Sequence, residues 1–233
     1  MTSSSNSSLT SPCVCLHSGD RMKRHEFHNL YETADENFKA ELIGGIVFVW
    51  QSLGRSHGKS HVRLSSVADR YVASTAGIEV CDNSTVFLSE KDEVQPDLFI
   101  RVLPEFGGQS HNAYESQYVA GAPELVAEVA HSSKAIDLHH KLRRYAKCGV
   151  LEYVVICLSP KRIYWFDLSK STQQKIYPDE HGIFKSSCFP GLWIHGEALL
   201  SMDYKLSMKI VDEGLSSPEH ALFVEQLTTK RIH

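Results

Sequence analysis

The segment at residues 123–158 most constrains the fold, because its pattern is that of a strand, a helix and a second strand. "PELVAEVA" alternates like a strand, a helical segment runs from about Lys134 to Lys147 and ends at Gly149, and "VLEYVVICL" is almost wholly apolar. Strands that are apolar on both faces are typical of the buried part of a parallel sheet. We therefore expect a βαβ unit that crosses over right-handed and pairs its strands in parallel.

Two helices and a hairpin are predicted before this unit. Apolar residues recur at steps of three and four over residues 23–39 and again over residues 56–74, where Ser56 can serve as N-cap. Between them, "ELIGGIVFVWQ" turns at a glycine pair and continues with β-branched and aromatic residues. This stretch predicts a hairpin or a bent strand.

The remaining segments predict an α/β fold with a mixed sheet. "IEVCD", "STVFL" and "PDLFIRV" are short strand signals, and a polar loop of about sixteen residues follows the last of them, a length that usually marks a functional or mobile segment. "KRIYWFDL", "QQKIYP" and "FPGLWIHG" predict an antiparallel extension of the sheet. Ser217 and Pro218 then open a short C-terminal helix as N-cap and first helical residue.

Composition excludes several classes of protein. A chain of 233 residues with 42% hydrophobic content is long enough for one domain of ordinary size. The net charge of −4 argues against a uniformly basic nucleic-acid coat, and no apolar run reaches the roughly 20 residues of a membrane span. Six cysteines without a CxxC pair favour free thiols in a reducing cytoplasm, and the Ser-rich residues 1–19 are expected to form a disordered tail.

Two acidic residues interrupt apolar strands. Glu128 shares a strand face with Val126 and Ala130, and Asp97 shares one with Phe99. If the two strands pair with their core faces aligned, both carboxylates lie on the same side of the sheet. At about 4 Å they would repel by roughly 4 kcal/mol at an effective dielectric near 20, which a proton or a divalent cation such as Mg²⁺ would relieve. The alternative, favoured by spacing alone, is that both acids face solvent or accept backbone N–H bonds.

A family resemblance bears on this choice. "AELIGG", "QPDLFIR", "GAPELVAEVAHSSKAIDLHHKLRRYAKCGVLEYVV" and "FPGLWI", in this order, resemble the Uma-two family of restriction-endonuclease-like proteins in the PD-(D/E)XK nuclease superfamily. The similarity covers residues 20–202 and leaves residues 203–233 as a C-terminal helical extension. It implies a restriction-endonuclease-like αβββαβ core with a mixed sheet.

The resemblance also implies site residues. Asp97 and Glu128 match the two acids that hold Mg²⁺ or Mn²⁺, and Glu41 matches an acid that reaches the same metal. Ala130 stands where the superfamily has a lysine, and Lys141 matches the lysine that family members carry in the following helix. The alternatives are an exposed Glu41, and an ordinary surface ion pair between Asp137 and Lys141 worth a few tenths of a kcal/mol.

Histidines and basic residues remain open to two interpretations. His57 and His61 lack a metal-ligand partner at a suitable spacing, so we expect a polar helix start, and we expect His139 and His140 at the surface. "KAIDLHHKLRRYAK" and "RSHGKSHVR" concentrate positive charge that can contact phosphates, although solvated helix faces are the commoner case.

These observations predict a cytoplasmic, Mg²⁺-dependent endonuclease that hydrolyses phosphodiester bonds in DNA and does not associate with membranes. Nucleases of this fold that cut both strands often dimerise, so a homodimer is compatible with this prediction. Ala130 motivates the alternative of a non-catalytic nucleic-acid-binding module that retains the nuclease fold. A hydrolase of another phosphoester would carry the same metal site.

Overall fold

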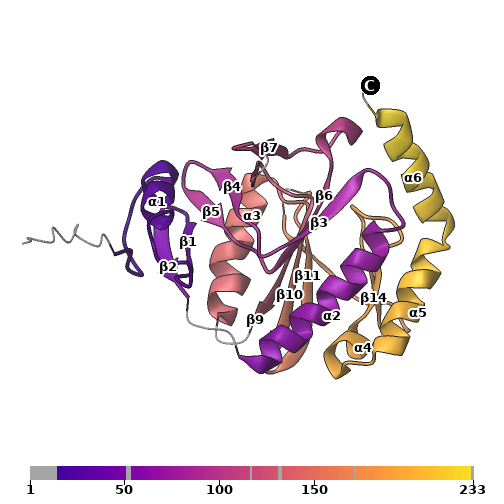
Figure 1. The fold of residues 1–233 in the computed structure, drawn as a ribbon. Coiled ribbons are helices and arrows are strands. Elements are labelled where there is room, and N and C mark those ends of the chain that lie inside the picture. Colours follow the sequence, from indigo (N-terminus) through magenta and orange to yellow (C-terminus); the bar gives the residue numbers. More distant parts are fainter. Residues whose placement is uncertain (1–14, 51–53, 116, 131–132, 171, 232–233) are drawn as a thin grey trace, which may run out of the picture.

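The computed structural model describes residues 15–50, 54–115, 117–130, 133–170 and 172–231 (Figure 1). Within these ranges the chain forms two six-stranded sheets and a two-stranded one. The hairpin β1–β2 and helix α1 lie at one end of the molecule, and helices α5 and α6 lie at the other (Figure 1). None of the helices in the described ranges has the length and apolar character needed to cross a membrane.

The central sheet has the strand order β12-β11-β10-β9-β6-β3. β9 and β10 pair in parallel, as predicted for the βαβ unit, and the other neighbours are antiparallel. The sheet is therefore mixed. Its strands are β3 (Ile78–Asp82), β6 (Leu98–Val102), β9 (Leu125–Ala130), β10 (Glu152–Leu158), β11 (Lys161–Asp167) and β12 (Gln174–Ile176).

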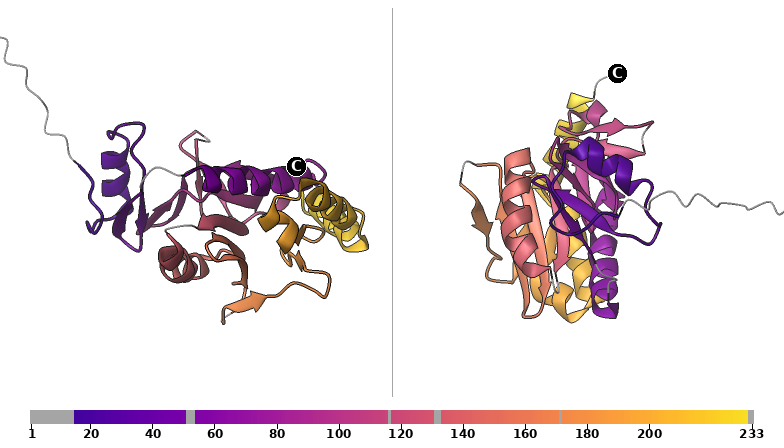
Figure 2. Two further views of the ribbon diagram at one scale, coloured as in Figure 1. Left: turned by 90° about the horizontal axis from the view of Figure 1, so that it is seen from below. Right: turned by 90° about the vertical axis from the view of Figure 1, so that its left-hand side faces the viewer.

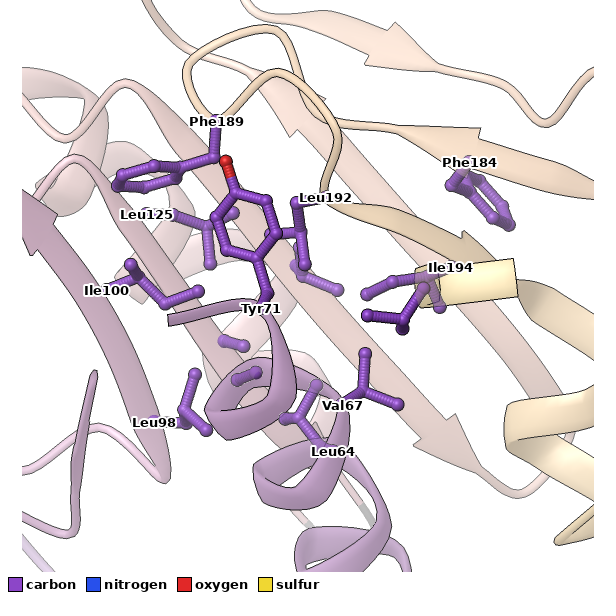
Figure 3. Packing of buried hydrophobic residues seen from close by; sticks show 14 of the residues in the cluster. Leu64, Val67, Tyr71, Leu98, Ile100, Leu125, Phe184, Phe189, Leu192 and Ile194 are labelled. Carbon is purple, nitrogen blue, oxygen red and sulfur yellow. The ribbon is translucent and has the colours of Figure 1, made fainter. Parts of the chain in front are cut away.

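Helices cover both faces of the central sheet, α2 on one side and α3 on the other (Figure 2). α2 (Arg55–Val72) packs on the strand side chains that point to one face of the sheet, including Leu98 and Leu125. Figure 3 shows this core. A π-helical turn η2 (Ile136–Lys141) and α3 (Leu142–Cys148) pack on the residues of the opposite phase, including Phe99 and Val126. Because both faces are buried, the central strands are mostly apolar, and Arg101, Glu128 and Glu152 are buried charged exceptions.

The second sheet has the order β2-β1-β5-β4-β8-β7 and lies beside α1 (Arg24–Tyr31). The predicted hairpin is β1–β2, and it turns at Gly44 and Gly45, which have φ angles of 64° and 81°. Glycine adopts this left-handed conformation without the steric cost that other residues incur. The strands are β1 (Ala40–Ile43), β2 (Ile46–Val49), β4 (Val86–Ser89), β5 (Asp92–Val94), β7 (His111–Ala113) and β8 (Tyr118–Ala120).

The last described part of the chain, from residue 183 onward, adds a small sheet and three helices. β13 (Ile183–Lys185) pairs with β14 (Trp193–His195), and α4 (Gly196–Ser201), α5 (Tyr204–Leu215) and α6 (Pro218–Lys230) follow. Ser217 caps α6 by accepting a bond from the His220 backbone N–H, as predicted. The segment "FPGLWIHG" was predicted to extend the central sheet, which is wrong, because β14 pairs only with β13 within the described sheets.

The predicted limits of the first two helices are also wrong. α1 ends at Tyr31 because the chain then turns, with the Ala34 backbone N–H bonded to the Tyr31 carbonyl at 3.1 Å. Phe38 lies beyond the helix but still packs beside Tyr31. The helix-like spacing of the apolar residues therefore extends past the end of α1. At α2 the N-cap is Gly54, and Ser56 lies inside the helix.

The predicted polar loop contains a 3-10 turn, η1 (Pro104–Phe106), and strands β7 and β8. Residues 1–14 of the predicted tail, with Cys13, lie outside the described residues, while Leu16 is buried beside Val47 and the β1 strand. The thiols of Cys81, Cys148, Cys157 and Cys188 are free, as predicted.

Candidate active site

Two antiparallel strands bring Asp97 and Glu128 together. Leu98 pairs with Ala127, so the next position outward places Asp97 opposite Glu128, and opposite residues share a face of the sheet. Both side chains are buried, which excludes the interpretation that they face solvent. Oδ2 of Asp97 accepts a 2.7 Å bond from the Val129 backbone N–H, so the backbone-bonding alternative is correct for this acid.

Lys141 reaches the same face from the helix after β9. Its side chain is 4% exposed, and Nζ lies 2.7 Å from Oε1 of Glu128 and 2.8 Å from Oε2 of Glu41. Glu41 comes from β1 of the other sheet and is buried, which contradicts the alternative of an exposed glutamate. One ammonium group therefore joins acids from both sheets.

A π-helical turn positions this lysine. η2 contains both Asp137 and Lys141, and both are buried, so the alternative of a surface ion pair is wrong. Oδ2 of Asp137 accepts a 2.5 Å bond from the Ser133 hydroxyl. A π-turn carries more residues per turn than an α-helix and is frequent at functional sites. His139 and His140, in the same turn, are exposed as predicted.

Three further side chains hold the acids in place, and the sequence interpretation missed their roles. His57 Nε2 lies 3.1 Å from Oδ2 of Asp97, which corrects the expectation of a merely polar helix start. The Tyr145 hydroxyl donates to Oε1 of Glu128 at 3.0 Å, and Trp50 Nε1 donates to Oε2 of Glu41 at 2.8 Å. The spacing of four residues between His57 and His61 was a usable sequence signal for their contact with Asp97, since His61 Nε2 also approaches the Asp97 carbonyl oxygen at 2.7 Å.

Burial and neighbouring charges shift the pKa values of these groups in opposite directions. Burial raises the pKa of Glu128 well above its usual range, although Lys141 counteracts it. Burial also acts to raise the pKa of Asp97. The hydrogen bond and the charge of His57 lower the pKa by more than burial raises it, so the net pKa lies below the usual value. For Lys141, burial lowers the pKa and the two glutamates raise it, with a net pKa well above that of an ordinary lysine.

Asp137 increases the excess of acid at this end of the sheet. Burial raises its pKa above the usual value, with Glu41 and Asp97 acting in the same direction. Lys141 thus contacts two buried carboxylates, and Asp97 and Asp137 lie near enough for their charges to interact with it. The mutual repulsion of these carboxylates favours a further cation or protonation of part of the set.

The donor set is compatible with a hard divalent cation. Mg²⁺ prefers oxygen ligands and is usually held by one or two carboxylates with waters and substrate oxygens, which Asp97 and Glu128 can provide. Both oxygens of Glu41 already accept hydrogen bonds, from Gln95, Trp50 and Lys141. Within the described ranges, no group of three or more His, Cys, Asp or Glu side chains is arranged to hold a metal by itself.

Comparison with known proteins identifies the family. The Uma2 family model, described as "Putative restriction endonuclease", matches residues 24–202. The chain belongs to this family. No curated protein matches it.

Among solved structures, the chain is similar to a DUF820 protein from Anabaena variabilis ATCC 29413, described as a "putative nuclease". The two share 13% sequence identity with a TM-score of 0.57, over 77% of this chain and 98% of the other. At this level of identity the comparison bears on the fold, and it agrees with the predicted nuclease-like α/β architecture of the Uma2 chain.

The structure also separates the basic residues of the predicted clusters. Arg144 forms an ion pair with the buried Asp92, so its charge is already partnered. Arg55 and Lys59 are exposed on the first turns of α2, close in sequence to His57. Ala130 is buried opposite Cys157 in the sheet.

Proposed function

We propose that this protein is a metal-dependent endonuclease that hydrolyses phosphodiester bonds in DNA, with Asp97 and Glu128 as ligands of Mg²⁺ or Mn²⁺. One observation carries the proposal: buried carboxylates from β1, η2 and the ends of β6 and β9 gather around a single buried lysine. This excess of acid is the environment in which a divalent cation is stabilised. Membership of the Uma2 family supports the same activity.

Each residue has a separate task in this proposal. A cation held by Asp97 and Glu128 would act as a Lewis acid, lowering the pKa of a water and offsetting charge on the phosphate. Lys141, fixed between Glu41 and Glu128, is positioned to orient the attacking water or to stabilise the charge of the transition state. Glu41 would lie beside such a cation as a further acid.

The supporting side chains fix the orientation of the acids. Tyr145 donates to the Glu128 oxygen that also contacts Lys141, which leaves the rest of the carboxylate for other ligands. His57 and the Val129 N–H both contact Oδ2 of Asp97. Partners of this kind fix ligand geometry and are typical of metal sites.

The test is cleavage of supercoiled plasmid DNA with Mg²⁺ or Mn²⁺, and with EDTA as the metal-free control. Asp97→Ala should lose cleavage, whereas Asp69→Ala, at an exposed position of α2, should cleave like the wild type. Equal activity of wild type and Asp97→Ala would falsify the proposal.

The contact between Lys141 and Glu128 also supports a second candidate, a nucleic-acid-binding module without catalysis. In that protein the lysine would neutralise the acid permanently, and Ala130 would mark the loss of the usual catalytic lysine. Metal titration distinguishes the two functions. If millimolar Mg²⁺ or Mn²⁺ neither binds nor raises the melting temperature, while DNA binding remains salt-dependent, the binding module is the correct assignment.

A further inference from the structure

A groove of about 710 Å³ lies outside the candidate active site, between the β11–β12 edge of the central sheet and helix α4. Its lining includes the apolar side chains of Ile163, Trp165, Phe184 and Leu200. The volume falls within the range of ligand pockets, roughly 300–1,000 Å³. The groove is therefore large enough for an extended ligand with apolar parts.

Positive charge is concentrated among the groove's lining residues. Lys161, Arg162 and Lys175 line it and are exposed, and none of them makes an ion pair within the described part of the chain. Glu197 is the one carboxylate among the lining residues. In a chain with a net charge of −4, this local excess of unpaired cations favours an anionic ligand.

Two tyrosines lie beside these cations. Tyr177 is 75% exposed, an unusual position for a large aromatic ring, and it lines the groove. Tyr164 lies between charges, with Arg162 Cζ 5.7 Å and Lys175 Nζ 5.9 Å from its ring centre. Exposed aromatic rings beside basic side chains are the arrangement that binds unpaired bases and their phosphates.

The register of the sheet relates one residue of the groove, Arg162, to the candidate active site, whereas Trp165 and the other apolar lining residues belong to the core on the α2 face. Ala130 pairs with Cys157 on β10, which in turn pairs with Arg162 on β11. Two strand spacings separate Arg162 from Ala130, about 10 Å across the sheet. Arg162 thus lies at the end of the sheet where Asp97 and Glu128 meet.

We propose that this groove binds a single-stranded segment of nucleic acid, with a base stacked on Tyr177 and phosphates contacting Lys161, Arg162 and Lys175. A base pair in a duplex hides both ring faces, so the exposed tyrosine selects an unpaired strand. The binding follows from the groove alone. Its role as a contact for substrate DNA rests on the proposed nuclease function.

The experiment measures binding of fluorescein-labelled oligo(dT) and of a duplex of equal length by anisotropy, in EDTA so that no cleavage occurs. Tyr177→Ala should weaken oligo(dT) binding about tenfold and leave duplex binding nearly unchanged, because one stacked base contributes roughly that factor. Leu222→Ala, which removes a 58% exposed side chain from α6, is the control and should bind like the wild type.

The charge contribution is measured from the salt dependence. Lys161→Ala/Lys175→Ala should reduce the slope of log affinity against log salt by about 1.4, since each phosphate contact to a single strand contributes about 0.7. Lys205→Ala, an exposed lysine of α5 on another part of the surface, should leave the slope unchanged. Thermal melting of every variant confirms that the fold is intact.

Two results would overturn the proposal: unchanged oligo(dT) affinity in Tyr177→Ala, or equal weakening of single strand and duplex by that variant. Failure of the groove is distinct from failure of the nuclease assignment. Plasmid cleavage by Asp97→Ala at the wild-type rate would reject the proposed nuclease site, and it would leave the oligo(dT) result for Tyr177→Ala in place.

Discussion

Nζ of Lys141 lies 2.7 Å from Oε1 of Glu128, in the interior between the two large sheets. The same nitrogen lies 2.8 Å from Oε2 of Glu41, on a strand of the second sheet. A buried cation with two acidic partners holds both sheets to the helix after β9. The contact thus has a structural consequence that can be measured without any assay of cleavage.

Lys141→Met should destabilise the protein by about 3–5 kcal/mol at neutral pH, because it leaves Glu41 and Glu128 buried without their cation. Urea unfolding measures the loss. The variant should also gain more thermal stability from added Mg²⁺ than the wild type does, since a divalent cation can replace the missing charge. Lys147→Met, on the exposed side of α3, should change stability by no more than about 0.5 kcal/mol. Equal stability of Lys141→Met and the wild type would show that the ion pair does not hold the sheets.

The two acids of the strands were accessible from the sequence, whereas their supporting residues were not. Alternation placed Asp97 and Glu128 on one face of paired strands, and the register agrees. His57 approaches Asp97 from 40 residues away, a contact that no local pattern encodes, whereas Trp50 and Glu41 lie in the same predicted hairpin segment, nine residues apart. Sequence periodicity describes neighbours along an element and says little about which elements meet.

The same limit applies to the fold. Strong apolar runs predicted β9, the helix after it and β10, because their signals are local and mutually consistent. β5 was missed because "DEV" has only three residues and two of them are acidic. Asp92 can be buried there because its ion pair with Arg144 offsets the cost of burying its charge. Sequence hydrophobicity does not reveal this contact between distant segments.

Asp92 should make stability depend on pH. Burial acts to raise its pKa. Hydrogen bonds from Arg144, Ser89 and the Gly44 N–H lower the pKa by more than burial raises it, so the net pKa lies below the usual value. A group whose pKa is lower in the folded state stabilises the protein above the unfolded pKa of about 4, and the contribution is lost as pH falls through the folded value.

Asp92→Asn should therefore cost about 3 kcal/mol at pH 7, the lower end for a broken buried pair because the Arg144 side chain retains 23% exposure. The difference from the wild type should shrink as the pH falls below about 4. Urea unfolding across pH measures both values, with Asp69→Asn at an exposed site as the control. A difference independent of pH would mean that the charge of Asp92 contributes nothing.

Two helical glycines should respond in opposite ways to alanine. Helix propensity favours alanine by about 1 kcal/mol. Gly58→Ala in α2 should gain up to this amount, because nothing lies within 4 Å of the added Cβ. Gly214→Ala in α5 should instead destabilise the protein by several kcal/mol, because its Cβ would lie 2.2 Å from the Gly191 carbonyl oxygen. Melting temperatures compare the pair, and a stabilised Gly214→Ala would contradict the close approach of α5 to this turn.

The proposed catalytic role of Lys141 can be tested by moving the lysine to another position. Ala130 and Glu128 share a face of β9, two residues apart, so a lysine at 130 is long enough to reach the same acid. If Lys141 stabilises the transition state, Lys141→Ala should reduce plasmid cleavage about 10²–10³-fold, the usual effect of losing one such donor. Ala130→Lys/Lys141→Ala should recover part of this loss, whereas Ala130→Met/Lys141→Ala, which supplies a side chain without charge, should recover none. Equal rates for the two double variants would show that a cation at this end of the sheet does not promote the reaction, and the role of Lys141 would then be confined to holding Glu41 and Glu128.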